Sequence, residues 1–129
     1  MAEGNAETVR RWFEALNRED FDAATALVHP EVEFVPPGGQ PPYRGARSLR
    51  RWMEPDALQG QVIEPLESEA AADGTVLQKE HVTARGASSG YKVDVVSWSV
   101  WSFDDEGLIR RGQVFLEHEE DRAREAAGL

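Results

Sequence analysis

Hydrophobic residues follow a helical period in the first part of the chain and an alternating period after about residue 61. Near the N-terminus, one apolar face has the i, i+3, i+4, i+7 spacing of an amphipathic helix, and it consists of Val9, Trp12, Phe13 and Leu16. Asn5 is placed to cap this helix, and Glu7 in the first turn suits the helix dipole. The pattern therefore predicts an N-terminal helix with one buried face.

Two further helices and a short strand are predicted before residue 56. Asp20 is placed to cap a second helix that ends at His29-Pro30, because a residue that precedes proline avoids the helical region. A β-branched and aromatic run predicts a strand over 32–35, and a proline- and glycine-rich segment follows it. A third helix carries an apolar stripe and ends at proline; its markers are Leu49, Trp52, Met53 and Pro55.

Alternation of apolar and polar residues predicts four strands in the second half. They span 62–71, 75–85, 91–103 and 108–117, and short turn-like segments connect them. Such connections favour an antiparallel meander. The last segment, 119–127, predicts a charged, alanine-rich helix or a frayed end. Helices followed by a meander predict the α+β class and a single domain over 1–129.

The strand predicted over 91–103 carries large apolar groups on both faces. Ser97, Ser99, Trp101 and Phe103 share one face, and Val96, Trp98 and Val100 share the other. A sheet covered by helices on one side normally leaves the opposite side polar. We therefore expect a homodimer that buries the second face sheet to sheet, with a dimer face of Val96, Trp98, Val100 and Phe115. The alternative is that a tail or loop of the same chain covers this face.

Composition narrows the class of protein. The chain has 129 residues, 40% of them hydrophobic and 29% charged, which suits one soluble domain. No apolar run approaches the length of a membrane span and no secretory leader precedes the domain, so a cytoplasmic protein with no membrane partner is expected. Cysteine is absent, which excludes disulfides and a thiolate nucleophile.

Charge argues against a nucleic-acid partner. The formal net charge is −10, and acidic residues are distributed along the whole chain. One basic cluster departs from this trend, and it consists of Arg44, Arg47, Arg50 and Arg51. It is either a solvated helix face or a rim that attracts an anionic substrate.

Five titratable residues fall on predicted strands or at their ends: Glu80, His81, Asp94, Glu117 and His118. His81 is the candidate catalytic residue, because histidine titrates near neutral pH. Glu80 and His81 point to opposite faces, and the sequence does not tell which of them faces a pocket. The three histidines lack ligand spacing and no GxGxxG or P-loop is present, so no metal and no cofactor are expected.

The aromatic residues indicate a ligand pocket more strongly than any acid does. We predict a pocket lined by Trp12, Phe34, Tyr43, Ser97, Ser99 and Trp101, with Trp52 as a further aromatic candidate. An apolar pocket with a few hydroxyl groups suits a small hydrophobic molecule. The alternative is that these residues form only the core of a small domain.

Several segments, taken in order, resemble the SnoaL-like proteins of the ketosteroid-isomerase and nuclear-transport-factor-like superfamily. They are ETVRRWFEALNREDFDAATALVHPEVEF, PPYRG, ARGASSG, VWSFDDEGLI and FLEHEEDRAREAAGL. The resemblance implies a cone-shaped α+β barrel, with three N-terminal helices packed on a curved, mostly antiparallel sheet around a deep pocket. It also implies, in most cases, a dimer.

The resemblance does not fix an activity. The steroid isomerases use a helix-one tyrosine, an aspartate base and a late-strand aspartic acid; these positions fall on Trp12, on Phe34 or Pro36, and on Ser99. The cyclases use an aspartate near the end of the sheet, and none occurs between Gly107 and Asp121. We expect a protein that binds a small hydrophobic molecule, with isomerase- or cyclase-type chemistry on a polyketide- or terpenoid-like substrate. The alternative is a non-catalytic ligand-binding or dimeric accessory protein.

Overall fold

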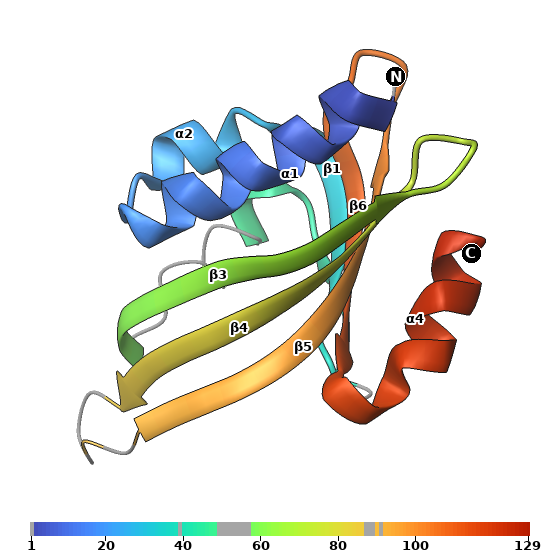
Figure 1. The fold of residues 1–129 in the computed structure, drawn as a ribbon. Helices are drawn as coiled ribbons and strands as arrows, with labels where there is room; N and C mark the ends of the chain where they lie inside the picture. Colours follow the sequence, from blue (N-terminus) through green and yellow to red (C-terminus); the bar gives the residue numbers. More distant parts are fainter. Residues whose placement is uncertain (1, 39, 49–57, 87–89, 91) are drawn as a thin grey trace.

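The fold is built on one six-stranded sheet, seen in a computed structural model that describes residues 2–38, 40–48, 58–86, 90 and 92–129 (Figure 1). The strand order is β2-β1-β6-β5-β4-β3. Neighbouring strands are antiparallel except for β1 and β6, which run parallel. The strands are β1 (Val28–Val35), β2 (Tyr43–Arg44), β3 (Leu58–Ala70), β4 (Val76–Gly86), β5 (Lys92–Phe103) and β6 (Ile109–Leu116). The predicted α+β class and mostly antiparallel sheet are confirmed.

Helices cover both faces of this sheet (Figure 1). α1 (Ala2–Asn17) and α2 (Phe21–Thr25) lie on the face that we call the inner face. A 3-10 turn (Glu117–Glu119) and α4 (Glu120–Ala127) lead to the opposite, outer face. Residues 46–48 are helical, as the predicted third helix requires, but its markers Leu49, Trp52, Met53 and Pro55 lie outside the described residues. None of the described helices has the length and apolar character needed to cross a membrane.

The second helix is shorter than predicted, and the strand after it is longer. α2 ends at Thr25, and β1 begins at Val28 and runs through His29-Pro30. The reason is tertiary: the backbone N–H of Ile109 donates to the carbonyl of Leu27 at 2.9 Å, which draws this segment alongside β6. Pro30 lies where the pairing of β1 with β6 changes register, so its missing N–H costs little.

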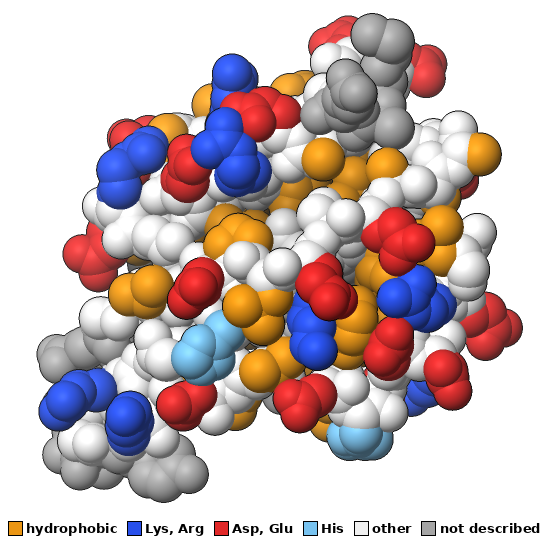
Figure 2. All heavy atoms as spheres, viewed as in Figure 1, with side chains coloured by type: hydrophobic (Ala, Val, Ile, Leu, Met, Phe, Trp, Pro, Cys, Tyr) orange, Lys and Arg blue, Asp and Glu red, His pale blue; other side chains and the backbone are white. Residues whose placement is uncertain are grey.

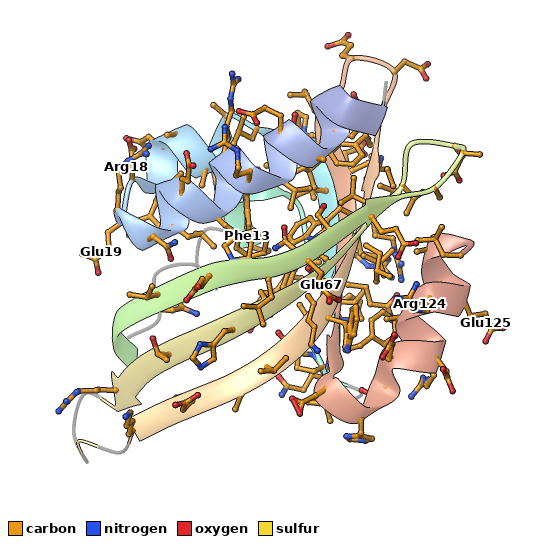
Figure 3. All side chains as sticks on the ribbon, viewed as in Figure 1. Phe13, Arg18, Glu19, Glu67, Arg124 and Glu125 are labelled. Atoms are coloured by element: carbon orange, nitrogen blue, oxygen red, sulfur yellow. The ribbon has the colours of Figure 1, made fainter. Side chains whose placement is uncertain are left out.

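The predicted apolar face of α1 forms the inner core. Val9, Trp12, Phe13 and Leu16 are buried against the sheet, and Figure 3 shows Phe13 between helix and strands. The Asn17 side chain donates to the carbonyl of Ile63 at 2.9 Å and accepts from its N–H at 2.7 Å. These two bonds fix the end of α1 to β3, so the helix lies at a defined height above the inner face.

The outer face is covered by the C-terminal segment, which is a helix and not a frayed end. Ala123 and Ala127 of α4 pack on a buried cluster that also contains Leu77, Trp98, Val100 and Phe115. Small alanine side chains let this short helix approach the aromatic groups closely. Figure 3 shows Arg124 directed toward the sheet and Glu125 directed away from it. The alternative in which a tail covers this face is therefore what the chain adopts.

Candidate functional site

A cavity of about 230 Å³ lies between α1 and the inner face of the sheet. It is smaller than the roughly 300–1,000 Å³ typical of sites for drug-sized ligands, so it suits a compact molecule. Val95 and Leu116 remain 50% and 41% exposed and form the open side of the cavity. Its lining is almost wholly apolar and comprises Trp12, Phe13, Phe34, Pro37, Gln61, Ile63, Glu80, Val82, Val95, Val96, Ser97, Trp101, Val114 and Leu116.

Glu80 is the ionisable residue in the described lining of this cavity. It lies on β4 opposite Ser97 of β5 and is only 2% exposed. Burial raises the pKa of the Glu80 carboxyl to about 8, and hydrogen bonds from Ser99 and Ser97 oppose that rise. The carboxyl is therefore largely protonated at neutral pH, and it titrates within the range that acid/base chemistry uses.

A patch of buried polar groups surrounds Glu80 on the inner face. Gln78 and Glu80 of β4 pair with Ser99 and Ser97 of β5, and all four residues are buried. The Trp101 indole donates to Ser99 Oγ at 2.7 Å. Three buried atoms have no hydrogen-bond partner among the described residues: Trp12 Nε1, Gln78 Nε2 and Glu80 Oε2. Unpaired buried polar atoms are costly, so they indicate a place where a ligand or water completes the bonding.

The structure brings together four of the six residues predicted for the pocket. Trp12, Phe34, Ser97 and Trp101 line the cavity. Ser99 is fully buried and reaches the site through its hydrogen bond with Glu80. Tyr43 is half-buried on β2 and packs against the inner core, away from the described lining. Trp52 lies outside the described residues.

His81 lies on the outer face, next to Glu80 in sequence and opposite to it in direction. Its Nε2 is 2.6 Å from Asp94 Oδ1, and this bond lowers the pKa of the Asp94 carboxyl. The side chain is about one third exposed and does not contribute to the described lining of the cavity. Of the two adjacent residues, Glu80 therefore faces the cavity. A catalytic role for His81 stays a prediction.

Residues assigned to a dimer face are placed differently from what the sequence suggested. Trp98, Val100 and Phe115 are buried within this chain by α4, and Val96 is half-buried and contributes to the cavity wall. The correction has a simple cause, because the C-terminal segment folds as an amphipathic helix and occupies the surface that a second copy would need. A homodimer stays a prediction, with no free patch at these residues to support it.

The basic cluster contributes to a second, shallower hollow of about 610 Å³ beside β1, β2 and β6. There Glu33 accepts from Arg111 Nε at 2.9 Å and lies 3.3 Å from Arg44 Nε, and the Arg111 bond lowers the pKa of Glu33. Arg110 donates to the carbonyl of Glu31. Because these charged side chains already bond one another or the backbone, the hollow has fewer buried, unpaired polar groups for a ligand than the inner cavity has in the described structure. Arg47 is exposed, and Arg50 and Arg51 lie outside the described residues.

Acidic and basic side chains are interspersed over the face shown in Figure 2, with apolar groups between them. Such mixing gives no single-sign field across that face of the molecule. In the part of the chain that the structure describes, no three His, Asp or Glu side chains gather in a group suited to hold a metal ion.

Similar solved structures share this fold at low sequence identity. The epoxide hydrolase/cyclase-like enzyme SalBIII, which has a role in pyran ring formation in the polyether salinomycin, is 22% identical with a TM-score of 0.81; the match covers 88% of this chain and 91% of that one. A putative polyketide cyclase from Xanthomonas campestris is 18% identical with a TM-score of 0.81, over 92% and 94% of the two chains.

A protein from Mycobacterium tuberculosis, in complex with estradiol-17β-hemisuccinate, is 12% identical with a TM-score of 0.78, over 86% of this chain and 92% of that one. No curated protein matches the sequence. The family model of the SnoaL-like domain matches residues 9–112, which include the second half of α1, the cavity walls on β3 to β5 and the start of β6. By this match over most of its length, the chain belongs to the SnoaL-like domain family.

Proposed function

We propose that the protein binds a compact, hydrophobic small molecule in the inner cavity, with Glu80 as the polar group that the ligand meets. The observation that carries this proposal is a buried carboxyl, 2% exposed, set in an apolar lining with its Oε2 atom unpartnered among the described residues. A carboxyl that only stabilised the fold would be expected to have both oxygens paired. The steroid derivative bound by a structural neighbour supports small-molecule binding in a fold of this kind.

We further propose acid/base chemistry, of isomerase or cyclase type, on a polyketide- or terpenoid-like substrate. A carboxyl whose pKa is about 8 holds a proton at neutral pH and can both release and recover it. Trp101 and Ser99 form a hydrogen-bonded chain that keeps the Glu80 side chain in place. Cyclase-like descriptions of two structural neighbours support this reaction class.

Non-catalytic binding is the second candidate, and one observation favours it. Glu80 stands alone as an ionisable group in the described lining, so the cavity offers no second acid or base for a two-residue mechanism. An accessory role through the outer face has less support, because α4 already covers Trp98 and Phe115. The exchange of protons next to the carbonyl of a bound ketone, followed in D₂O, distinguishes the two candidates. Exchange faster than in buffer would indicate catalysis, and exchange at the buffer rate would indicate binding alone.

The binding proposal is tested with the neutral fluorescent probe N-phenyl-1-naphthylamine and two matched variants. Val95 and Val62 are both about half exposed on neighbouring parts of the sheet, but only Val95 belongs to the cavity lining. Val95→Trp fills the open side and is expected to weaken probe binding at least tenfold. Val62→Trp is expected to bind like the wild type. Equal affinities for the two variants, or no binding by the wild type, would contradict the proposed site.

A further inference from the structure

We propose a second binding site, for a phosphate group, in the polar hollow beside β1, β2 and β6. The hollow has a volume of about 610 Å³, and none of its described lining residues belongs to the inner cavity. Apart from Pro30 and Gly45, each described lining residue carries a polar or charged side chain. The site goes beyond the proposed function, because it concerns another part of the molecule and another class of ligand.

Strand register builds the centre of this hollow. Arg44 of β2 lies opposite Glu33 of β1, and Glu33 lies opposite Arg111 of β6. Arg111 in turn lies opposite Ser102 of β5. Residues paired in this way project to the same face of a sheet, and Phe34, the neighbour of Glu33, projects to the inner cavity. Four neighbouring strands therefore place these polar side chains in one row on the face away from the inner cavity.

Glu33 holds two guanidinium groups next to each other. Its Oε1 accepts from Arg111 Nε at 2.9 Å, and its Oε2 lies 3.3 Å from Arg44 Nε. The hydrogen bond from Arg111, with the charges of Arg44 and Arg110, holds the pKa of Glu33 below its usual range, so this carboxylate is charged at neutral pH. Because both oxygens belong to one carboxylate, the arginines of β2 and β6 lie within reach of a single small anion.

The arginines keep N–H groups that a ligand can use. Arg44 forms its ion pair through Nε, and its Nη1 and Nη2 have no partner among the described residues. Arg111 uses Nε and Nη1, the latter toward Gln113 at 3.0 Å, and Nη2 has no described partner. Arg110 uses Nη1 toward the carbonyl of Glu31. Since each guanidinium carries five N–H donors, three side chains still offer donors in the hollow.

The charge of the lining indicates an anion. Three arginines face two glutamates in this hollow, whereas the whole chain has 14 basic and 24 acidic side chains. The excess of positive charge is therefore opposite to the trend of the protein. A hydrophobic molecule would find no aromatic or large aliphatic side chain in the described lining. The ligand of this hollow is thus unlike the ligand proposed for the inner cavity.

Phosphate fits these arginines better than a carboxylate does. Its oxygens match the planar fork of a guanidinium group, and a phosphate monoester carries nearly two negative charges at neutral pH. It can therefore bond guanidinium groups on two strands at once, although Glu33 lies between them. A carboxylate brings one charge, which Glu33 already supplies. The volume of the hollow also leaves room for a small polar group attached to the phosphate.

The test measures binding of inorganic phosphate and of glycerol 3-phosphate by NMR at pH 7.5 and constant, low ionic strength. Both probes should shift the backbone amides of Arg44, Gly45 and Arg111 in a saturable way. Arg44→Gln and Arg111→Gln should each weaken binding about fivefold, a modest loss because the site is partly exposed. Arg122→Gln removes an exposed arginine of α4 outside the described lining and should bind like the wild type.

Comparison of the two probes identifies the source of the phosphate. Tighter binding of glycerol 3-phosphate would indicate a phosphate ester, and equal affinities would indicate free phosphate; both results support the site. Shifts that do not saturate, or equal weakening by all three variants, would overturn the inference, because the anion would then respond only to overall charge. Binding of N-phenyl-1-naphthylamine should not change when phosphate is added, so the proposed function is tested independently.

Discussion

The two faces of one sheet satisfy their polar groups in opposite ways, and Glu80 and His81 show this within two adjacent residues. His81 projects to the outer face, where it is partly exposed and bonded to Asp94 at 2.6 Å. Glu80 projects to the inner face, where it is almost fully buried and has one oxygen unpartnered among the described residues. Two adjacent residues thus place one titratable side chain in a partly exposed hydrogen-bonded pair and the other in an apolar cavity.

The two tryptophans on β5 extend the comparison. On the outer face, the Trp98 indole donates to the carbonyl of Glu117 at 3.3 Å, and the cations of Lys79 and Arg124 lie 5.3 and 5.7 Å from its ring. On the inner face, the Trp101 indole donates to Ser99. Nε1 of the neighbouring Trp12 has no hydrogen-bond partner among the described residues. The Trp98 indole on the outer face thus has a hydrogen-bond partner within the chain, whereas the Trp12 indole on the inner face has none among the described residues. That difference supports the proposal that a ligand binds at the inner face.

The largest expected effect concerns Glu80 and pH. Because burial raises its pKa from 4.5 to about 8, the folded state keeps a proton that the unfolded state releases between these values. The stability that this proton provides is fully present below pH 4.5 and is lost as pH rises through 8. Relative to Glu80→Gln, the wild type should lose on the order of 5 kcal/mol between pH 4 and pH 9.

Urea unfolding of both proteins at several pH values measures this difference directly. The comparison with Glu80→Gln removes contributions from other titrating groups, including Glu33 and Asp94, whose pKa values are lowered. A difference in unfolding free energy that does not change with pH would mean that Glu80 is solvated, and the contrast between the two faces would then fail.

The next effect concerns the outer cluster. Trp98→Ala removes the largest side chain beneath α4 and should cost about 3 kcal/mol, toward the lower end for a buried tryptophan because the short helix can settle onto the gap. Affinity for N-phenyl-1-naphthylamine should stay close to that of the wild type, with Trp98→Phe as the milder control. A loss of probe affinity that exceeds the loss of folded protein would show that the two faces are coupled.

The sequence predicts the fold of this protein more completely than it predicts the site. Periodicity placed α1 and four of the strands within a few residues, because both patterns repeat over many positions. The start of β1 was missed, since pairing of Leu27 with Ile109 overrides the helix-ending signal of His29-Pro30. The sequence did not determine whether a second copy or the C-terminal segment covers Trp98, because alanines in a charged tail give only a weak apolar face.

For the site, the sequence predicted six pocket residues, four of which line the cavity, and it assigned the acid/base role to His81, which lies on the outer face. The face of each residue depends on strand register, which alternation alone does not determine. One signal was available: Ser97, Ser99 and Trp101 share a face of β5, and Glu80 of β4 lies opposite Ser97 on that face. The sequence gives no signal for the missing hydrogen-bond partners of Trp12 Nε1 and Glu80 Oε2, because these depend on how the chain packs in three dimensions.

A smaller effect is expected at Gly112, where β6 passes beneath Trp101. A Cβ at this position would lie 2.6 Å from Trp101 Cζ3, so Gly112→Ala forces the indole to move. Overpacking of this kind costs about 1–3 kcal/mol. The displaced ring should also reduce probe affinity, which urea unfolding and fluorescence titration measure separately. If neither the unfolding free energy nor the probe affinity changed, the indole of Trp101 would be able to move aside without cost. Gly4→Ala, at an exposed position of α1 where an added Cβ has nothing within 4 Å, controls for the loss of a glycine.

The smallest effect is expected for His81→Ala on the outer face. Exposed hydrogen-bonded pairs of this kind contribute little to stability, so the unfolding midpoint and probe affinity should match those of the wild type. Once a substrate is known, turnover by this variant tests the catalytic role that the sequence suggested for His81. Loss of turnover with normal probe binding would restore His81 as a catalytic candidate and weaken the assignment of chemistry to the inner face.

The most direct test of the central claim is the titration of the Glu80 carboxyl by ¹³C NMR, with its resonance assigned by comparison with Glu80→Gln. A neutral acid in a ligand cavity should titrate near pH 8, and its resonance should shift when N-phenyl-1-naphthylamine is added at pH 6.5. A midpoint near 4.5, with no response to the probe, would place Glu80 in water and contradict the account.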